Sequence, residues 1–226
     1  NVELESVLEA TGKKNMLEAV QRLSRLANFV YLRQTKDYPY GNASPLLVAK
    51  DLIAEGEPFV YMFGDDLVKS RVPAVRQLIR SWEKEPKTWV LACQEVAPQE
   101  VGQYGIIKLK NGAGRYVASI IEKPTIEESP SNLAIFGRFI FDKRIYRYLN
   151  AKKLGKGGEL WVADGISGFL GKGGKIMAAK IEGEWLTTGD PLNYLKATVS
   201  YALSREELSA PFKSFLLETL KNSGEG

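Results

Sequence analysis

The sequence predicts an α/β protein with a mainly parallel, mixed sheet and helices on both faces. Apolar runs typical of strands, such as residues 59–63, alternate with segments of helical apolar spacing, such as residues 72–82. Two further runs, at residues 106–109 and 115–121, flank Asn111-Gly112 and predict a β-hairpin. The hairpin and the strand expected after it add an antiparallel portion to the sheet.

The first elements expected along the chain are helices. An acidic helix at residues 3–9 and an amphipathic one beginning near Met16 come before any strand. Residues 29–34 predict a strand, and the turn-rich residues 38–44 lead into a helix that continues to Ala54. The apolar run at residues 59–63 does not alternate with polar residues, so we expect a fully buried parallel strand there.

The alternation continues to the end of the chain. After the helix of residues 72–82 we expect these elements: a strand at 88–96, the hairpin, a strand at 133–141, a short helix capped by Asp142, a mobile loop at 152–158, a helix at 159–170, a strand at 175–181 and two closing helices. We expect one domain over residues 1–226, with residues 204–226 as a C-terminal helical tail.

Composition excludes several classes of function. There is no histidine, which excludes Ser-His-Asp and Cys-His catalysis and His-bound zinc, so metal chemistry would use carboxylates and a hard cation such as Mg²⁺. The net charge of +4 comes from basic residues that are scattered along the chain, which suits small anions as ligands better than nucleic acid.

The single cysteine, Cys93, and the tryptophans are assigned to packing. No apolar run of membrane length and no signal peptide is present, so the expected location is cytoplasmic, away from membranes.

Two charged pairs follow predicted strands. Asp65 and Asp66 come after the run at residues 59–63, where ligands bind in open α/β sheets. One carboxylate would bind a metal while the other holds the loop; the alternative is an acidic surface turn with a helix cap. Glu122 and Lys123 end another apolar run, where a carboxylate and an ammonium suit a sugar phosphate, unless they form only an exposed ion pair.

Three further residues have both a binding and a plain structural interpretation. The Gln34 amide matches the edge of a uracil or thymine ring, and Gly41 would let a base approach the backbone, yet each also suits a polar strand end or a turn. Asp190 precedes Pro191 at a helix start, where it would cap the helix or face a ligand.

Taken in order, these segments resemble the bacterial UTP–glucose-1-phosphate uridylyltransferases over nearly the whole chain. The resemblance is carried by residues 3–5, 33–34, 41, 63–66, 104–106, 122–124, 130–134, 158–159, 164–166 and 188–191. It implies a Rossmann-like nucleotidyltransferase fold. It also implies Mg²⁺-assisted, in-line transfer of a uridylyl group from UTP to glucose 1-phosphate, with UDP-glucose and pyrophosphate as products.

The same resemblance implies a role for each site residue. Gln34 and Gly41 would contact the uracil, and Asp65 would bind the metal. Gly105 and Glu122 would contact the glucose. The remaining two assignments concern the sugar phosphate: Lys123 would contact the phosphate and act in catalysis with Asp65, and Asn132 belongs to the same substrate-binding block.

Two departures from the family pattern are visible. The glycine-rich G-x-G-T-R loop that cradles the triphosphate is absent, so we expect an N-terminally truncated domain that is unstable unless another chain covers the gap. Thr187 stands where the family has its second metal-binding carboxylate. Asp190 lies nearby in the sequence, and its compensation for Thr187 is a hypothesis.

These departures keep two alternatives open. One is a non-catalytic sugar-nucleotide-binding or regulatory homologue, favoured by Thr187 and the missing loop. The other is a nucleotidyltransferase for a different base or sugar. The last helix, with Phe212, Phe215 and Leu216, has more apolar surface than one face needs, which predicts either core packing or a subunit contact in a homo-oligomer.

Overall fold

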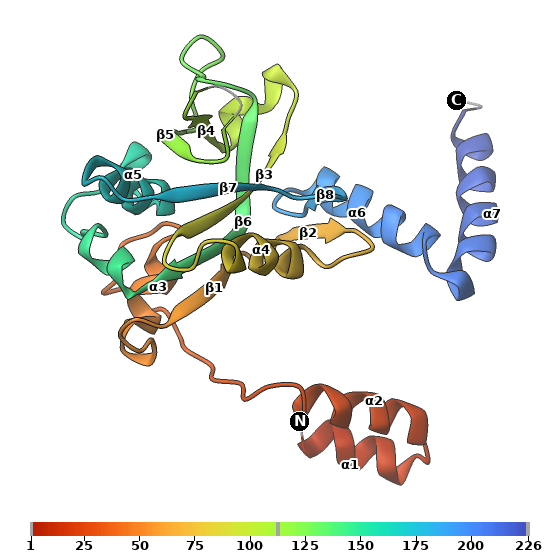
Figure 1. Cartoon of the computed structure of the whole chain (residues 1–226). Helices are drawn as coiled ribbons and strands as arrows, with labels where there is room; N and C mark the ends of the chain where they lie inside the picture. Colours follow the sequence, from red (N-terminus) through yellow and green to blue (C-terminus); the bar gives the residue numbers. More distant parts are fainter. Residues whose placement is uncertain (1, 112–113, 225–226) are drawn as a thin grey trace. The chain divides into compact units, whose positions relative to one another are not determined.

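The computed structural model describes residues 2–111 and 114–224 and divides the chain into two compact units, Asn1–Lys36 and Asp37–Gly226. The first unit contains a helical hairpin, α1 (Val2–Ala10) and α2 (Lys14–Ser24), as Figure 1 shows. The turn between them uses Gly12 at φ 66°, a conformation that costs glycine little. Both helices were predicted, whereas the single domain over residues 1–226 stays a prediction.

The strand predicted at residues 29–34 does not form. These residues are exposed, and they make no β-ladder with any described strand. A strand is stable only when its backbone groups pair with a neighbour, so strand-like composition alone leaves this segment as irregular chain. The prediction is therefore wrong for this structure.

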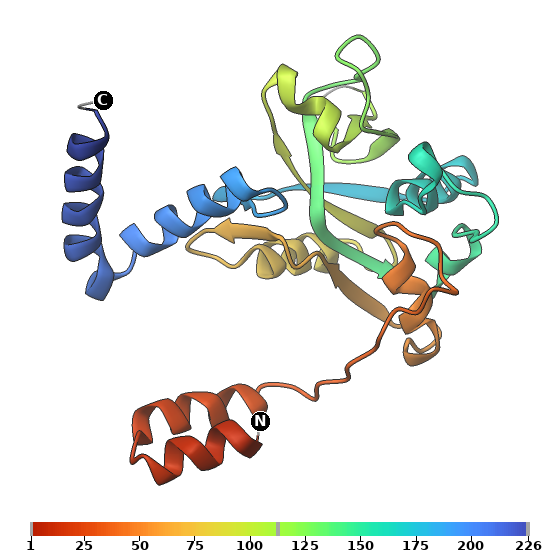
Figure 2. The same cartoon turned by 180° about the vertical axis from the view of Figure 1, so that it is seen from behind.

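A six-stranded sheet organises the second unit (Figures 1 and 2). Its order is β5-β4-β6-β3-β7, and β1 pairs with β6 as well. The strands are β1 (Pro58–Met62), β3 (Trp89–Glu95), β4 (Gly105–Leu109), β5 (Val117–Glu122), β6 (Leu133–Asp142) and β7 (Ile176–Lys180). β6 is the longest and almost wholly buried, and it contacts β1, β3 and β4, so it is the strand on which the sheet depends.

The mixed α/β fold class is confirmed, but the balance of strand directions differs from the prediction. Among the described ladders only β3 with β7 is parallel. β1 is half-exposed and antiparallel to β6, so the fully buried parallel strand expected at residues 59–63 is wrong. β1 has a described ladder on one side only, which leaves it less buried than its apolar sequence suggested.

Helices pack on both faces of the sheet, as predicted. On one face α3 (Ser44–Ala49) and α5 (Val162–Gly171) cover a core in which Trp89 stacks on Phe169 with ring centroids 3.8 Å apart. On the other face α4 (Ala74–Glu83) places Leu78 against Val90 and Ile140. Cys93 lies in the first core, where burial raises the pKa of its thiol to about 12, as a structural cysteine requires.

Short elements connect these layers. Four 3₁₀ turns are described: η1 (Lys50–Leu52), η2 (Pro98–Gln103), η3 (Lys143–Arg147) and η4 (Lys156–Gly158).

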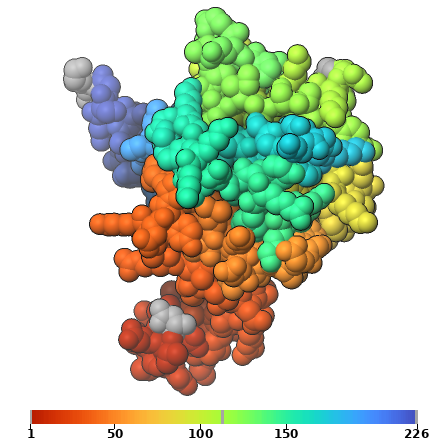
Figure 3. Space-filling view, turned by 90° about the vertical axis from the view of Figure 1, so that its left-hand side faces the viewer, coloured from red at the N-terminus to blue at the C-terminus, as the bar shows by residue number. Residues whose placement is uncertain are grey.

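 Asp142 caps the third of these turns, since its carboxylate accepts from the backbone N–H of Arg144, as the sequence predicted. The chain between β6 and α5 lies beside α5 and β7 on one side of this unit (Figure 3). The β4–β5 hairpin is confirmed, although Gly112 of its predicted turn lies outside the described residues.

Two short strands were not predicted from the sequence. β2 (Asp66–Lys69) and β8 (Glu184–Thr187) pair antiparallel in a separate two-stranded sheet, with Asp66 opposite Thr187. Beyond β8 come α6 (Pro191–Leu203) and α7 (Glu206–Ser223). α7 buries none of its residues, so core packing of this helix is wrong and a subunit contact stays a prediction. No helix in the described ranges is long and apolar enough to span a bilayer.

Gly137 on β6 should be intolerant of a side chain. A Cβ at this position would lie 2.3 Å from both Cβ and Cγ of Phe63. We expect Gly137→Ala to lower the free energy of unfolding by about 2 kcal/mol or more, measured by urea denaturation, because overpacking a filled core forces its neighbours apart. Gly171→Ala is the control, since nothing lies within 4 Å of a Cβ there. Equal stability of the Gly137 variant and the wild type would contradict this packing.

Candidate active site

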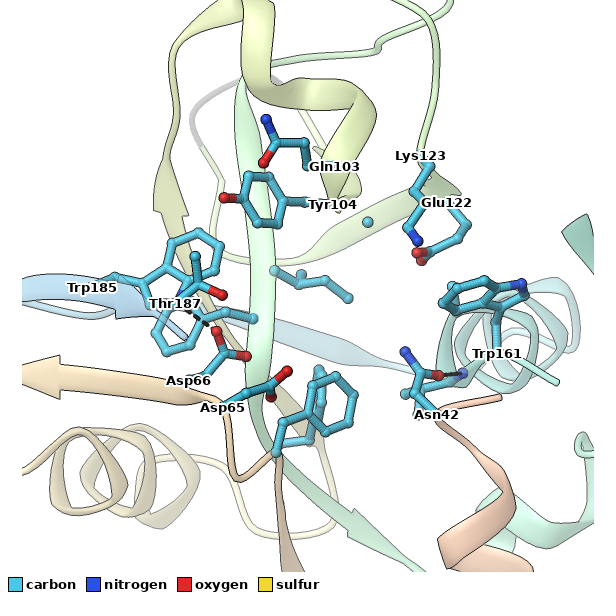
Figure 4. A pocket seen from close by; sticks show the side chains of 17 residues that line it. Asn42, Asp65, Asp66, Gln103, Tyr104, Glu122, Lys123, Trp161, Trp185 and Thr187 are labelled. Carbon is cyan, nitrogen blue, oxygen red and sulfur yellow. Dashed lines mark hydrogen bonds between the residues drawn. The ribbon is translucent and has the colours of Figure 1, made fainter. Parts of the chain in front are cut away.

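A pocket of about 200 Å³ opens in the second unit where several strand ends meet (Figure 4). Its lining combines three carboxylates, a lysine and several aromatic rings, as follows: Asn42, Phe63, Asp65, Asp66, Gln103, Tyr104, Gly105, Glu122, Lys123, Ile135, Phe136, Phe139, Trp161, Val162, Ala163, Trp185 and Thr187. It is concave and combines apolar walls with convergent polar groups, which is typical of a small-molecule site.

The adjacent carboxylates Asp65 and Asp66 have different surroundings. Asp66 is only 6% exposed, and its carboxylate accepts hydrogen bonds from Trp185 Nε1 at 2.6 Å and from Gly137 N at 2.7 Å. Burial raises the pKa of Asp66, and these two hydrogen bonds oppose that rise. Asp66 thus joins three strands, while the exposed Asp65 carboxylate lines the pocket without any such anchor.

The two positions expected to bind a metal lie close together. A Cβ built at Gly189 would be 3.3 Å from Asp65 Oδ2 and 3.7 Å from Thr187 Oγ1, so both oxygens border the same glycine. The backbone of Asp65 is fixed from the same side, because its carbonyl accepts from Thr188 N at 2.7 Å. This arrangement offers a cation one carboxylate and one neutral hydroxyl.

Asp190 takes the capping role that the sequence kept open. Its carboxylate accepts from Asn193 N at 3.0 Å and from Asn193 Nδ2 at 2.5 Å, at the start of α6. These hydrogen bonds lower the pKa of Asp190, and the residue does not line the pocket. No group of three or more acidic, histidine or cysteine side chains able to hold a metal occurs in residues 2–111 and 114–224.

Gly105 and Glu122 face each other at the end of the β4–β5 ladder. A Cβ on Gly105 would lie 3.0 Å from Glu122 Oε2, so the glycine leaves room for this carboxylate. Burial raises the pKa of Glu122 to about 7, against the opposing effect of the Lys123 charge, and Asp164 adds to the rise. Near neutral pH Glu122 can therefore either donate or accept a hydrogen bond to a sugar hydroxyl.

Lys123 follows directly and has an unusual backbone for a non-glycine residue, with φ 46°. Its N–H donates to Tyr104 O at 2.9 Å, and its ammonium lies 4.5 Å from the centroid of the Trp161 ring. In Figure 4 Glu122 and Lys123 lie above Trp161, across the cavity from Asp65 and Thr187. The structure thus brings together the predicted residues Asp65, Glu122 and Lys123.

Three other predicted contacts are not part of the pocket lining. Asn132 is exposed at the start of β6, where its carbonyl accepts from Val96 N at 3.0 Å. Gly41, at φ 133°, packs against Leu160, whose carbonyl oxygen would be 2.3 Å from a Cβ added there. Gln34 belongs to the first unit. Substrate contacts by these residues stay predictions.

Several lining residues were missed because their role depends on packing between distant segments. Asn42, next to Gly41, reaches the pocket, and its Oδ1 accepts from Val162 N at 2.8 Å. Assigning all tryptophans to packing was right for Trp89, which is 1% exposed, but incomplete for Trp161 and Trp185, which line the pocket. The spacing of Trp185 and Thr187, two residues apart, would have indicated a shared face had β8 been recognised.

Comparison with known proteins defines the class to which this fold and site belong. A protein-family model described as "Nucleotidyl transferase" matches residues 3–204. The chain belongs to the nucleotidyl transferase family and, within it, to the UTP–glucose-1-phosphate uridylyltransferases.

Two curated relatives carry this narrower assignment. The UTP–glucose-1-phosphate uridylyltransferase of Staphylococcus epidermidis is 37% identical over 95% of this chain and 73% of its own length. The enzyme of the same name from Bacillus subtilis is 35% identical over 99% of this chain and 75% of its own.

Solved structures agree on the fold. A UTP-bound UGPase from Acinetobacter baumannii matches with a TM-score of 0.81 at 26% identity, covering 96% of this chain and 75% of that one. A UDP-glucose pyrophosphorylase complexed with UDP-glucose matches with a TM-score of 0.74 at 28% identity, covering 86% and 74%. The α/β nucleotidyltransferase fold predicted from the sequence is therefore confirmed.

Because the pKa of Glu122 is raised, the stability of the protein should depend on pH in a specific way. The ¹³C resonance of its carboxyl group should titrate near pH 7, whereas the exposed Glu127, whose pKa is lowered, should titrate below 4.5. Because the folded protein retains the Glu122 proton longer than the unfolded chain, wild-type stability should fall relative to Glu122→Gln as pH rises from 4.5 to about 7. A Glu122 midpoint near 4.5 would contradict the described burial.

Proposed function

We propose that this protein transfers the uridylyl group of UTP to glucose 1-phosphate, forming UDP-glucose and pyrophosphate. The observation that carries the proposal is that one pocket is lined by Asp65 on one side and by Glu122 and Lys123 on the other. The names of the curated relatives and the UTP and UDP-glucose in two related structures support this choice of substrates.

The reaction needs positioning and charge compensation more than a protein nucleophile. A phosphate oxygen of glucose 1-phosphate attacks the α-phosphorus of UTP, and the bond from that phosphorus to the bridging oxygen breaks as pyrophosphate leaves. Lys123 binds the sugar phosphate and reduces the repulsion between the two anions. Glu122 binds a glucose hydroxyl. Gly105, which has no side chain, leaves space beside the Glu122 carboxylate for that hydroxyl. No covalent intermediate with the protein is required.

Nucleotidyltransferases generally use a divalent metal, and the residues here fit one. Mg²⁺ is commonly held by one or two carboxylates together with substrate phosphates, and Asp65 offers an exposed carboxylate at the pocket. We propose Asp65 as the Mg²⁺ ligand from this chain, with the Thr187 hydroxyl beside it. When bound, the ion would compensate the charge of the triphosphate.

The remaining expectations belong to the same proposal. Gln34 and Gly41 would bind the uracil, and Asn132 would support the substrate-binding block. UTP and glucose 1-phosphate would be the small-molecule partners, in a cytoplasmic protein. The exposed apolar side chains of α7, including Phe215 and Leu220, would suit contact with a second copy.

A specific observation favours a second candidate. By the family resemblance a carboxylate is expected at Thr187, which supplies a hydroxyl. Asp190 caps α6 instead, so Asp65 is the acidic side chain that borders Gly189 together with Thr187. A homologue that binds sugar nucleotides without turnover would have such a site. If the wild type binds UDP-glucose but releases no pyrophosphate, and Thr187→Asp restores release, this second candidate is the better description.

Loss of the Asp65 charge should separate catalysis from stability. We expect Asp65→Asn to lower kcat/KM for pyrophosphate release from UTP, glucose 1-phosphate and Mg²⁺ by about 10²-fold or more, because the metal loses its carboxylate ligand. The melting temperature should stay the same, since the Asp65 side chain is exposed. Asp51→Asn is a matched control at another exposed aspartate. Full activity of Asp65→Asn would contradict the assigned role.

A further inference from the structure

The side chain of Lys123 belongs to a closed set of contacts with Trp161 and Lys156. The Lys123 ammonium lies over the Trp161 ring, 4.5 Å from its centroid. Trp161 Nε1 donates to Lys156 O at 2.8 Å, and Lys156 Nζ in turn donates to Lys123 O at 2.5 Å. Lys123 and the segment from Lys156 to Trp161, which follows it more than 30 residues later, therefore fix one another at the edge of the pocket.

We propose that Trp161 and Lys156 are positioning residues, which hold the Lys123 ammonium in place for a sugar phosphate before that substrate binds. This inference rests on the proposed function for the identity of the substrate. The contact between Lys123 and Trp161 can be tested without it.

An aromatic face suits this task better than a carboxylate would. A lysine side chain is long and flexible, so holding it in one position in advance reduces the ordering needed on binding. The face of the indole attracts the ammonium through its quadrupole and does not neutralise it. N–H donors that point away from the ring remain able to reach a phosphate.

The ring itself is well fixed. Trp161 is only 9% exposed and precedes α5, where its backbone N–H donates to Asp164 Oδ2 at 3.2 Å. The backbone of Lys123 is fixed as well, through its hydrogen bond to Tyr104 O at 2.9 Å. Both partners of the cation–π contact thus start from rigid positions, which is what a positioning role requires.

Kinetics of matched variants test the role. Trp161→Leu should raise KM for glucose 1-phosphate by about 5- to 10-fold and KM for UTP by less than about 2-fold, whereas Trp161→Phe, which keeps a ring, should stay within about 3-fold of wild type. Lys156→Met should raise KM for glucose 1-phosphate by about 3-fold. Lys153→Met, an exposed lysine of the same turn-rich segment, is the control and should change neither constant.

A direct measurement addresses the contact in the protein without ligand. The ε-methylene protons of Lys123, assigned by comparison with Lys123→Arg, should resonate upfield because of the ring current of Trp161. Trp161→Leu should abolish this shift and Trp161→Phe should keep most of it.

The outcomes separate this inference from the proposed function. An active wild type whose KM for glucose 1-phosphate is unchanged by Trp161→Leu would overturn the positioning role and leave the proposed function intact. If the wild type neither turns over nor binds glucose 1-phosphate, the proposed function fails. In that case the NMR result decides alone: an upfield Lys123 signal that Trp161→Leu removes supports the held ammonium, and an unshifted signal overturns it.

Discussion

The buried carboxylate of Asp66 is the interaction on which the site depends. It accepts from the indole of Trp185 on β8 and from the backbone of Gly137 on β6, and so fastens the small β2–β8 sheet to the large one. Arg138 adds to this junction by donating to Phe63 O at 2.8 Å. With the turn before β2 fixed in this way, Asp65 is left exposed at the pocket. The Asp66 carboxylate therefore stabilises the junction, and the Asp65 carboxylate lies at the pocket.

The two sides of the pocket have separate origins. Asp65 directly precedes β2 and Thr187 ends β8, whereas Glu122 ends β5 and Lys123 follows it. Both sides reach the same pocket because β6 pairs with β4 and bonds to Asp66 through Gly137. A reaction between two anionic substrates needs this kind of frame, since small errors in the relative position of the two sides would separate the reacting atoms.

The sequence predicted the elements with a strong local pattern of apolar residues and missed those that are defined only by contacts with distant segments. The strong apolar patterns of β3, β6 and α4 identified these elements correctly. Of the residues that the sequence singled out, Asp65, Glu122 and Lys123 line one pocket. Residues 29–34 have strand-like composition but no described ladder, and the four-residue strands β2 and β8 have a ladder but little pattern. The place of Trp161 in the pocket was not predicted for the same reason. Its contact with Lys123 joins residues that are 38 positions apart in the sequence.

Asp66 and Trp185 act together to join the two sheets through the hydrogen bond between them. A double-mutant cycle of Asp66→Asn and Trp185→Phe, followed by urea denaturation, measures that coupling most directly. Because the hydrogen bond involves a buried carboxyl acceptor, we expect a coupling free energy of about 1.5 kcal/mol. Effects of the two substitutions that simply add, to within about 0.3 kcal/mol, would show that the sheets are joined by other contacts and would contradict the claim.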